Sequence, residues 1–128
     1  MRRILIIDDD ATNREILKWE LCKDCEVEEM STGEGAASAI AAGDHDLILL
    51  DQMMPFKSGM EVVEELRAEA PDKLRLIVLV TAALTRELVA SASRFELAGA
   101  VERPYLPEEI RALVDRYCPE DPASEEVS

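Results

Sequence analysis

Short runs of consecutive apolar residues alternate along this chain with stretches of helical periodicity. Apolar runs at 3–7, 25–30, 47–50 and 76–80, and a shorter one around residues 100–101, predict five β-strands. Helical patterns occupy residues 12–21, an alanine-rich stretch ending at residue 42, and residues 58–69, 86–98 and 107–117. Because the apolar residues of the strands are nearly continuous rather than alternating, we expect a sheet that is covered on both faces.

Local sequence signals mark several helix boundaries. Ser31 and Ser58 are each followed three residues later by a glutamate, which is the spacing of a capping box and predicts two helix starts. Gly43 is expected to end the second helix, and Pro71 to close the segment after the third. Pro107 suits the first turn of the last helix.

The regular alternation of strand and helix predicts an α/β domain with a doubly wound parallel sheet and helices on both faces. In open sheets of this kind, the functional site lies at the carboxyl ends of the strands, where the strand order reverses. Residues 1–118 are predicted to form this single domain. Residues 119–128 carry several acids and no apolar periodicity, and we interpret them as an acidic, mobile C-terminal tail.

The net charge of the chain argues against two classes of binding partner. The 128 residues include 28 Asp and Glu against 14 Lys and Arg, a net charge of −14. Such a chain repels nucleic acid and anionic membranes, both of which require clustered cations. No run approaches the roughly 18–20 apolar residues of a membrane span, and the N-terminus lacks a signal-peptide pattern. The expected compartment is the cytoplasm.

The three cysteines agree with that compartment, because an odd number does not suggest a secreted disulfide framework. Cys22 and Cys25 have the spacing of a redox or zinc motif. A zinc site needs two further ligands, and the chain offers only Cys118 and His45. A redox pair should open a helix, whereas this pair follows one. We therefore interpret the pair as small apolar residues at a helix-to-strand turn, and we expect His45 to be an ordinary surface residue.

Polar residues stand at the end of most predicted strands. Residues 8–10, all aspartates, follow the first strand, Asp51 the third, Thr81 the fourth and Arg103 the fifth. In a parallel sheet these residues share one edge, where converging carboxylates repel one another unless a cation or protons intervene. Mg²⁺, which binds carboxylate oxygens and keeps several of its waters, is the cation best suited to neutralise these carboxylates. Together with a hydroxyl and a guanidinium, the arrangement suits a transferring phosphoryl group, for which a carboxylate can be the nucleophile.

At this point the sequence resembles the receiver domain of response regulators, in its chemotaxis-type, single-domain form, over residues 3 to about 117. The resemblance rests on a combination of motifs: Ile-Asp8-Asp9-Asp10, Leu-Leu-Asp51-Gln-Met-Met-Pro55 with Gly59, Val-Thr81-Ala82, and Arg103-Pro104-Tyr105. It implies a flavodoxin-like fold, a five-stranded parallel sheet in the order 2-1-3-4-5 with five helices.

The resemblance also implies an acceptor and a metal site. Asp51 corresponds to the aspartate that accepts a phosphoryl group from a histidine kinase or a phosphotransfer protein. Asp9 and Asp51 would ligate Mg²⁺ directly, together with the backbone carbonyl of Met53. Asp8 would act through a metal-bound water. Asp10 is expected to lie at the rim of the site or to cap a helix rather than to bind the metal.

The phosphate-binding and switch positions depart from the family pattern at two places. By resemblance, Thr81 would hydrogen-bond a phosphoryl oxygen, and the small Ala82 would leave the site open. Arg103 replaces the usual lysine and keeps its charge, although it could instead pair structurally with the acidic cluster. Ala100 stands where many receivers carry a switch aromatic, and Tyr105 corresponds to the aromatic after the proline.

The leading hypothesis is a stand-alone receiver that is phosphorylated on Asp51 in a Mg²⁺-dependent reaction and signals through altered protein–protein contacts. By resemblance, its output face is built from the fourth helix, the fifth strand and the fifth helix. We expect no enzymatic turnover beyond self-phosphorylation and autodephosphorylation. Met53 stands where a Mg²⁺-dependent phosphatase needs a second aspartate, and no glycine-rich phosphate loop follows the first strand.

Two alternatives stay open. Arg103 and Ala100 favour a phosphorylation-independent interaction module that keeps the fold but has lost the switch. The chain could also be a receiver excised from a larger hybrid kinase, although Met1 directly before the first strand favours a natural start.

Overall fold

The computed structural model describes residues 1–103 and 106–117. The interpretations of Pro104, Tyr105, Cys118 and the 119–128 tail fall outside these residues. The elements, in chain order, are β1 (Arg2–Ile7), α1 (Ala11–Leu21), β2 (Cys25–Met30), α2 (Ala36–Ala42), β3 (Leu47–Asp51), α3 (Gly59–Glu69), the 3-10 helix η1 (Pro71–Leu76), β4 (Ile77–Thr81), α4 (Arg86–Arg94), β5 (Gly99–Glu102) and α5 (Pro107–Tyr117).

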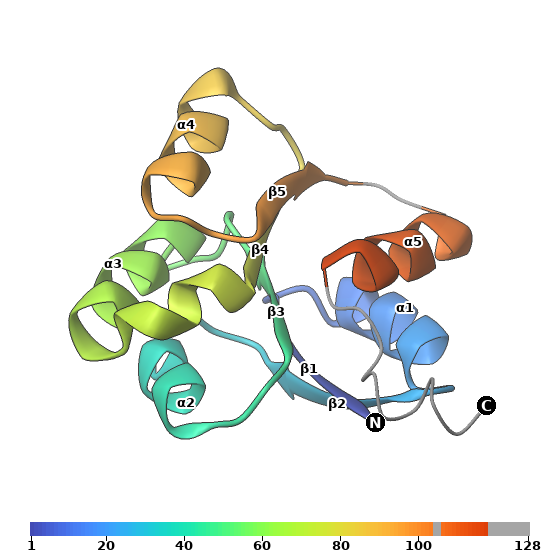
Figure 1. Cartoon of the computed structure of the whole chain (residues 1–128). Coiled ribbons are helices and arrows are strands. Elements are labelled where there is room, and N and C mark those ends of the chain that lie inside the picture. The colour runs from blue at the N-terminus through green and yellow to red at the C-terminus, as the bar shows by residue number, and fades with distance from the viewer. Residues whose placement is uncertain (104–105, 118–128) are drawn as a thin grey trace.

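The five strands form one parallel sheet in the order β2-β1-β3-β4-β5, which confirms the predicted topology. Figure 1 shows α1 and α5 on one face of the sheet and α2, α3 and α4 on the other. Among the described residues, none of the helices combines the length and the apolar character needed to cross a bilayer.

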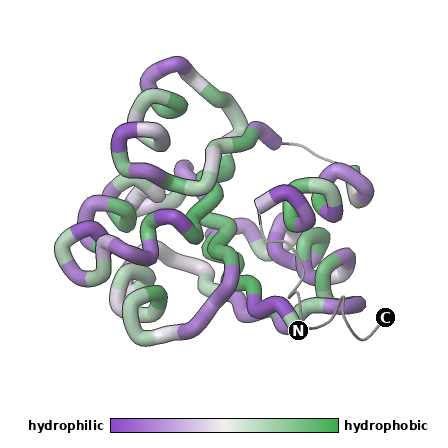
Figure 2. The backbone as a smooth tube through the Cα atoms, in the orientation of Figure 1, coloured by the Kyte–Doolittle hydropathy of each residue, from purple (hydrophilic) through white to green (hydrophobic). Residues whose placement is uncertain are grey.

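Two apolar clusters hold the helices on the sheet. Every residue of β3 and β4 is buried. Successive side chains of a strand point to opposite faces, so Ile48 and Leu50 pack toward α2 and α3, whereas Leu47 and Leu49 pack toward α1 and α5. Figure 2 shows this apolar centre along the strands. The polar residues that end β3 and β4 are therefore held by strands buried on both faces.

The second helix begins later than its sequence suggests. The capping box expected at Ser31 does not form, and α2 starts at Ala36 after Gly35, which has a φ of 78° and provides no side-chain cap. Gly33 explains the delay, because its α-carbon lies against α3 and the loop before it; a Cβ there would come within 3.1 Å of Val62. The chain must turn at this contact before a helix can begin.

The fourth helix ends earlier than predicted, at Arg94 rather than residue 98. Phe95 is buried in the core, and Glu96 takes a positive φ of 58° that turns the chain toward β5. The amide of Ala98 then donates to the carbonyl of Ile77 at the start of β4. The need to align β5 with β4 therefore overrides a helical periodicity that continues in the sequence.

Lys73 stabilises the end of α2 from a distant part of the chain. Its ammonium donates to the carbonyls of Ile40 (3.1 Å), Ala41 (2.9 Å) and Gly43. The last carbonyls of a helix have no partner within the helix, so this lysine acts as a tertiary cap. It belongs to η1, a segment that also delays the start of β4 from the predicted residue 76 to Ile77.

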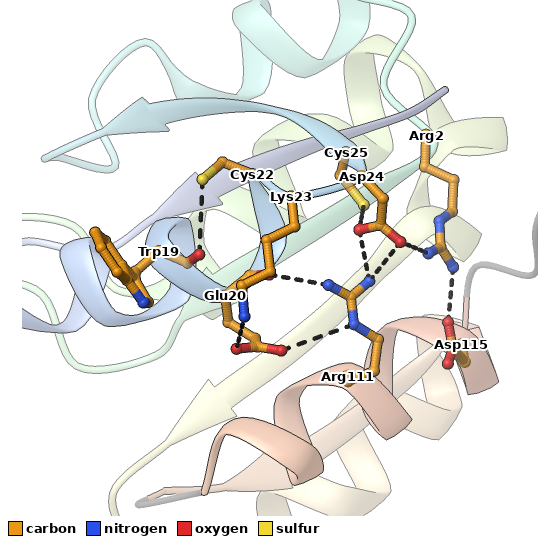
Figure 3. Close-up of polar contacts among 9 residues, drawn as sticks. All are labelled: Arg2, Trp19, Glu20, Cys22, Lys23, Asp24, Cys25, Arg111 and Asp115. Carbon is orange, nitrogen blue, oxygen red and sulfur yellow. Dashed lines mark hydrogen bonds and ion pairs between the residues drawn. The ribbon is translucent and has the colours of Figure 1, made fainter.

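The Cys22–Cys25 segment lies at the α1–β2 turn, as predicted, with Cys22 exposed and Cys25 buried. Figure 3 shows an ionic network around it. Arg111 of α5 contacts both carboxylate oxygens of Asp24, at 2.7 and 2.9 Å. The buried Arg2 reaches Asp115 of α5 at 2.9 Å. These contacts attach α5 to the edge of the sheet opposite the carboxyl ends of the strands.

The exposure of two side chains does not follow their polarity. Trp19 is 77% exposed on α1, because the core face of that helix is occupied by Leu17 and Leu21. The expectation that His45 is an ordinary surface residue is wrong. The side chain of His45 is only 6% exposed, and its Nε2 lies 3.2 Å from Glu28. The loop before β3 folds this imidazole inward, which a pattern of local polarity does not reveal.

Candidate functional site

The polar residues at the strand ends meet at one edge of the sheet, as predicted. Asp8 directly follows β1, Asp51 is the last residue of β3, and Thr81 is the last residue of β4. Arg103 directly follows β5. Asp8, Asp51 and Thr81 are each at most 3% exposed. Buried polar residues need hydrogen-bond partners, so these residues form an enclosed polar site at this edge rather than a solvated surface.

Three aspartates form the acidic centre of the site. One carboxylate oxygen from each of Asp8, Asp9 and Asp51 lies within 4.8 Å of the others, and Asp9 is exposed to solvent. Hard divalent cations such as Mg²⁺ take carboxylate oxygens and retain several waters. Two buried carboxylates and one exposed carboxylate at this spacing fit such a cation. Among the described residues, these three aspartates are the acidic, histidine or cysteine side chains that lie close enough together to hold a metal ion.

Burial and repulsion both act on Asp51. Burial, and after it the neighbouring charge of Asp8, raise the pKa of its carboxyl group to about 7. Arg103 and a hydrogen bond from the Met53 amide (3.3 Å) oppose this rise. The Met53 backbone therefore reaches the site, while the residue as a whole is 67% exposed. The role of its carbonyl as a metal ligand stays a prediction.

This pKa makes the stability of the protein depend on pH. The folded-state pKa lies above the ordinary value of 3.8, so the stability that Asp51 contributes is present at acid pH and is lost as the pH rises through about 7. We expect Asp51→Asn to exceed the wild type in free energy of unfolding at pH 8 without divalent cations, by on the order of 2 kcal/mol. Urea unfolding at pH 8 and pH 5 measures this difference, which should shrink at pH 5. Equal stabilities at both pH values would contradict the raised pKa.

The turn after β1 is held by its own aspartates and by α1. Asp10 caps α1, accepting from the amides of Thr12 (2.8 Å) and Asn13 (3.3 Å), which confirms the capping alternative for this residue. The amide of Asp10 donates to Asp8 Oδ1 at 2.9 Å. Arg14 of α1 donates to the Asp8 carbonyl at 2.6 Å, a contact that the sequence analysis missed. The direction of the Asp8 carboxylate is therefore fixed before any ligand binds.

Thr81 and Ala82 form the opposite side of the site. The Thr81 hydroxyl is buried and lies 3.3 Å from both the amide and the carbonyl of Ala83. Ala82 is exposed, and its role in leaving the site open stays a prediction. Ala100 of β5 pairs in register with Leu79 and packs against the core, with only a methyl group at this position.

Arg103 joins the two buried carboxylates. Its Nη1 lies 2.7 Å from Asp8 Oδ2, and its Nη2 lies 3.1 Å from Asp51 Oδ1. The alternative in which Arg103 pairs with the acidic cluster is therefore the arrangement seen here. Its role toward a phosphoryl group stays a prediction.

Hydrogen bonds within the loop from β3 to α3 hold the backbone that directly follows Asp51. The amide of Gly59 donates to the Gln52 carbonyl (3.1 Å), and Gln52 Oε1 accepts from the Met60 amide (2.9 Å). Ser58 forms the predicted capping box with Glu61. The Gln52 contact was missed, because a single glutamine carries no local signal for a side chain that caps its own loop.

The chain is similar to known proteins over most of its length. The family model of the response regulator receiver domain matches residues 4–115. The response regulator MprA of Mycolicibacterium vanbaalenii is 37% identical over 96% of this chain and 54% of its own length. The chemotaxis protein CheY-3 of Vibrio cholerae is 27% identical over 89% of both chains. The chain thus spans about half the length of the MprA proteins it matches.

Solved structures show the same fold. The chemotaxis protein CheY4 of Vibrio cholerae superposes with a TM-score of 0.82 at 24% identity, covering 91% of this chain and 98% of that one. The response regulator TrrA of Thermotoga maritima, in complex with Mg(2+)-BeF, has a TM-score of 0.75 at 32% identity, covering 91% of this chain and 99% of that one.

Proposed function

This chain belongs to the family of response regulator receiver domains, and we propose that it accepts a phosphoryl group on Asp51 from a histidine kinase or a phosphotransfer protein. The observation that carries the proposal is the position of Asp51. It is buried at the end of a central strand, with carboxylate oxygens of Asp8 and Asp9 within 4.8 Å and Arg103 within 3.1 Å. This is a negative centre with a fixed cation beside it.

The proposed step is a displacement at phosphorus. A carboxylate oxygen of Asp51 attacks the phosphoryl group of a phosphohistidine, an O–P bond forms, and the N–P bond breaks. The donor imidazole keeps the electron pair of the broken bond. A bound Mg²⁺ would neutralise charge on the phosphoryl oxygens. Asp9 and Asp51 would hold it with the Met53 carbonyl, and Asp8 would contribute through a water. The Mg(2+)-BeF complex of TrrA supports this cofactor.

Two side chains would recognise the product. The Thr81 hydroxyl lies at the adjacent strand end, and Arg103 already contacts the Asp51 carboxylate. Phosphorylation adds negative charge at this point, which both groups would then bind. The same chemistry supports a phosphoacceptor that signals rather than an enzyme that turns over a separate substrate.

The proposed readout is a change in protein–protein contacts in the cytoplasm. α4 buries only Ala92 among its residues, and Val89 is 48% exposed. A helix held by so few contacts can shift at low cost. Together with β5 and α5 it would form the output face, as in the resemblance. A net charge of −14 argues against nucleic acid as the partner of this chain.

The test is direct phosphorylation of the protein. Incubation with acetyl phosphate and MgCl₂, followed by intact-mass spectrometry, should show one added phosphoryl group, because the site needs no partner protein for the chemistry. EDTA in place of MgCl₂ should strongly reduce the adduct, since the carboxylates would then repel the donor. Absence of an adduct with Mg²⁺ present would refute the proposal.

A second candidate is a receiver-like interaction module whose contacts do not depend on phosphorylation. The observations that favour it are Ala100, which provides no aromatic side chain in β5, and the pairing of Arg103 with both buried aspartates. Amide hydrogen exchange of the phosphorylated and unphosphorylated protein separates the two candidates. Changed protection across α4 and β5 supports the switch, and unchanged protection supports the module.

A further inference from the structure

Arg103 forms a fork between two buried carboxylates that belong to different strands. Asp8 follows β1 and Asp51 ends β3, yet one guanidinium contacts both, at 2.7 and 3.1 Å. The side chains are nearly inaccessible: 5% exposed for Asp8, 2% for Asp51 and 16% for Arg103. The Arg103 amide also donates to the Thr81 carbonyl at 2.8 Å, which positions the residue. Charges in such a place are poorly screened by solvent and salt.

The fork uses oxygens that lie in the acidic centre itself. Asp8 is engaged on both oxygens, Oδ1 by the Asp10 amide and Oδ2 by Arg103. Asp51 Oδ1 accepts from both Arg103 and the Met53 amide. In the described part of the chain, no N–H group donates to the Asp9 carboxylate or to Asp51 Oδ2. The single positive charge of the guanidinium thus lies between the two buried carboxylates and offsets part of their negative charge, while Asp9 lies outside this bridge.

We propose that Arg103 is an internal counter-cation that competes with the divalent cation for the Asp8–Asp51 pair and so lowers the affinity of the site for Mg²⁺. The inference rests on the proposed metal site and adds to it a residue, Arg103, that sets its affinity for Mg²⁺. A guanidinium keeps its charge at any physiological pH and presents two N–H groups in a plane, so it can hold two carboxylates at once. A cation that binds these carboxylates must approach a fixed positive charge.

The test is a Mg²⁺ titration of the unphosphorylated protein at pH 8 by isothermal calorimetry, without any phosphodonor. We expect Arg103→Met to bind Mg²⁺ on the order of tenfold more tightly than the wild type, because the competing charge is gone. Arg103→Lys keeps the charge but loses the fork and should fall between them. Arg75→Met removes the same charge in η1, at the opposite edge of the sheet, and should match the wild type within about twofold.

Thermal unfolding with and without Mg²⁺ provides a second readout. The increase in Tm on adding Mg²⁺ should be larger for Arg103→Met than for the wild type, because tighter binding to the folded state stabilises it more. Backbone NMR spectra of each variant check that the fold is kept. If Arg103→Met does not fold, Arg103→Lys alone decides, and it must bind Mg²⁺ more tightly than the wild type.

The outcomes separate this inference from the proposed function. Equal Mg²⁺ affinity of the wild type and the Arg103 variants overturns the counter-cation role, even if Asp51 accepts a phosphoryl group. Tighter binding by both variants supports the role, even if no adduct forms on Asp51. A gain in affinity of similar size in Arg75→Met would assign the effect to net charge and would also overturn the inference.

Discussion

Asp51→Asn is expected to lose the phosphoryl adduct completely when the protein is treated with acetyl phosphate and Mg²⁺. The amide that replaces the carboxylate has no anionic oxygen to attack phosphorus, and its shape leaves the surroundings intact. Asp51 is 2% exposed and its Oδ1 accepts from Arg103 and Met53, so the variant changes the chemistry of one oxygen more than the packing. Intact-mass spectrometry measures the loss.

Asp10→Asn is the matched control for this experiment. Asp10 belongs to the same row of aspartates, but it is exposed and caps α1. Asparagine caps helices about as well as aspartate, so the helix start should be unaffected. The control should form the adduct at close to the wild-type rate. An adduct of equal yield on Asp51→Asn would place the acceptor elsewhere, and peptide mapping would then locate it.

Gly59→Ala is expected to have the largest effect among the substitutions on stability. A Cβ at this position would lie 2.7 Å from the Asp51 carbonyl oxygen, 2.9 Å from Leu79 Cδ1 and 3.0 Å from Gln52 Cα. Two of these neighbours are backbone atoms of the acceptor strand and its loop, which cannot yield without moving Asp51. We expect the free energy of unfolding to fall by about 2–3 kcal/mol, as in other overpacked sites.

The same substitution should slow phosphorylation, because the displaced backbone carries the acceptor. Urea unfolding and the rate of adduct formation measure the two effects. Gly35→Ala is the comparison: a Cβ there meets nothing within 4 Å, and only its φ of 78° opposes the change, at about 1 kcal/mol. It should leave the rate of adduct formation unchanged. A Gly59→Ala protein as stable as the wild type would show that this contact can relax.

The agreement between sequence and structure is best where one physical signal dominates. Continuous apolar runs predicted β3 and β4, and both strands are buried at every position. Parallel pairing then places the carboxyl ends of the strands together. For this reason the convergence of Asp8, Asp51, Thr81 and Arg103 could be predicted before any coordinates were known.

The disagreements occur where a distant contact overrides a local pattern. The helical periodicity after residue 94 continues in the sequence, but Phe95 turns inward and β5 must pair with β4. Lys73 caps α2 across about thirty residues, at 2.9 and 3.1 Å from two of its carbonyls. Such contacts leave no periodicity and no motif, since they depend on which segments the fold brings side by side.

The sequence by itself determined the fold class, the edge of the sheet that carries the site and the residue types that meet there, because burial and strand polarity are written in local patterns. Only the tertiary structure decided what those residues do to one another. It placed the Arg103 guanidinium between Asp8 and Asp51, residues 95 and 52 positions away along the chain. The pairing of charges depends on distances in space and on burial, and the local sequence around each residue determines neither of them.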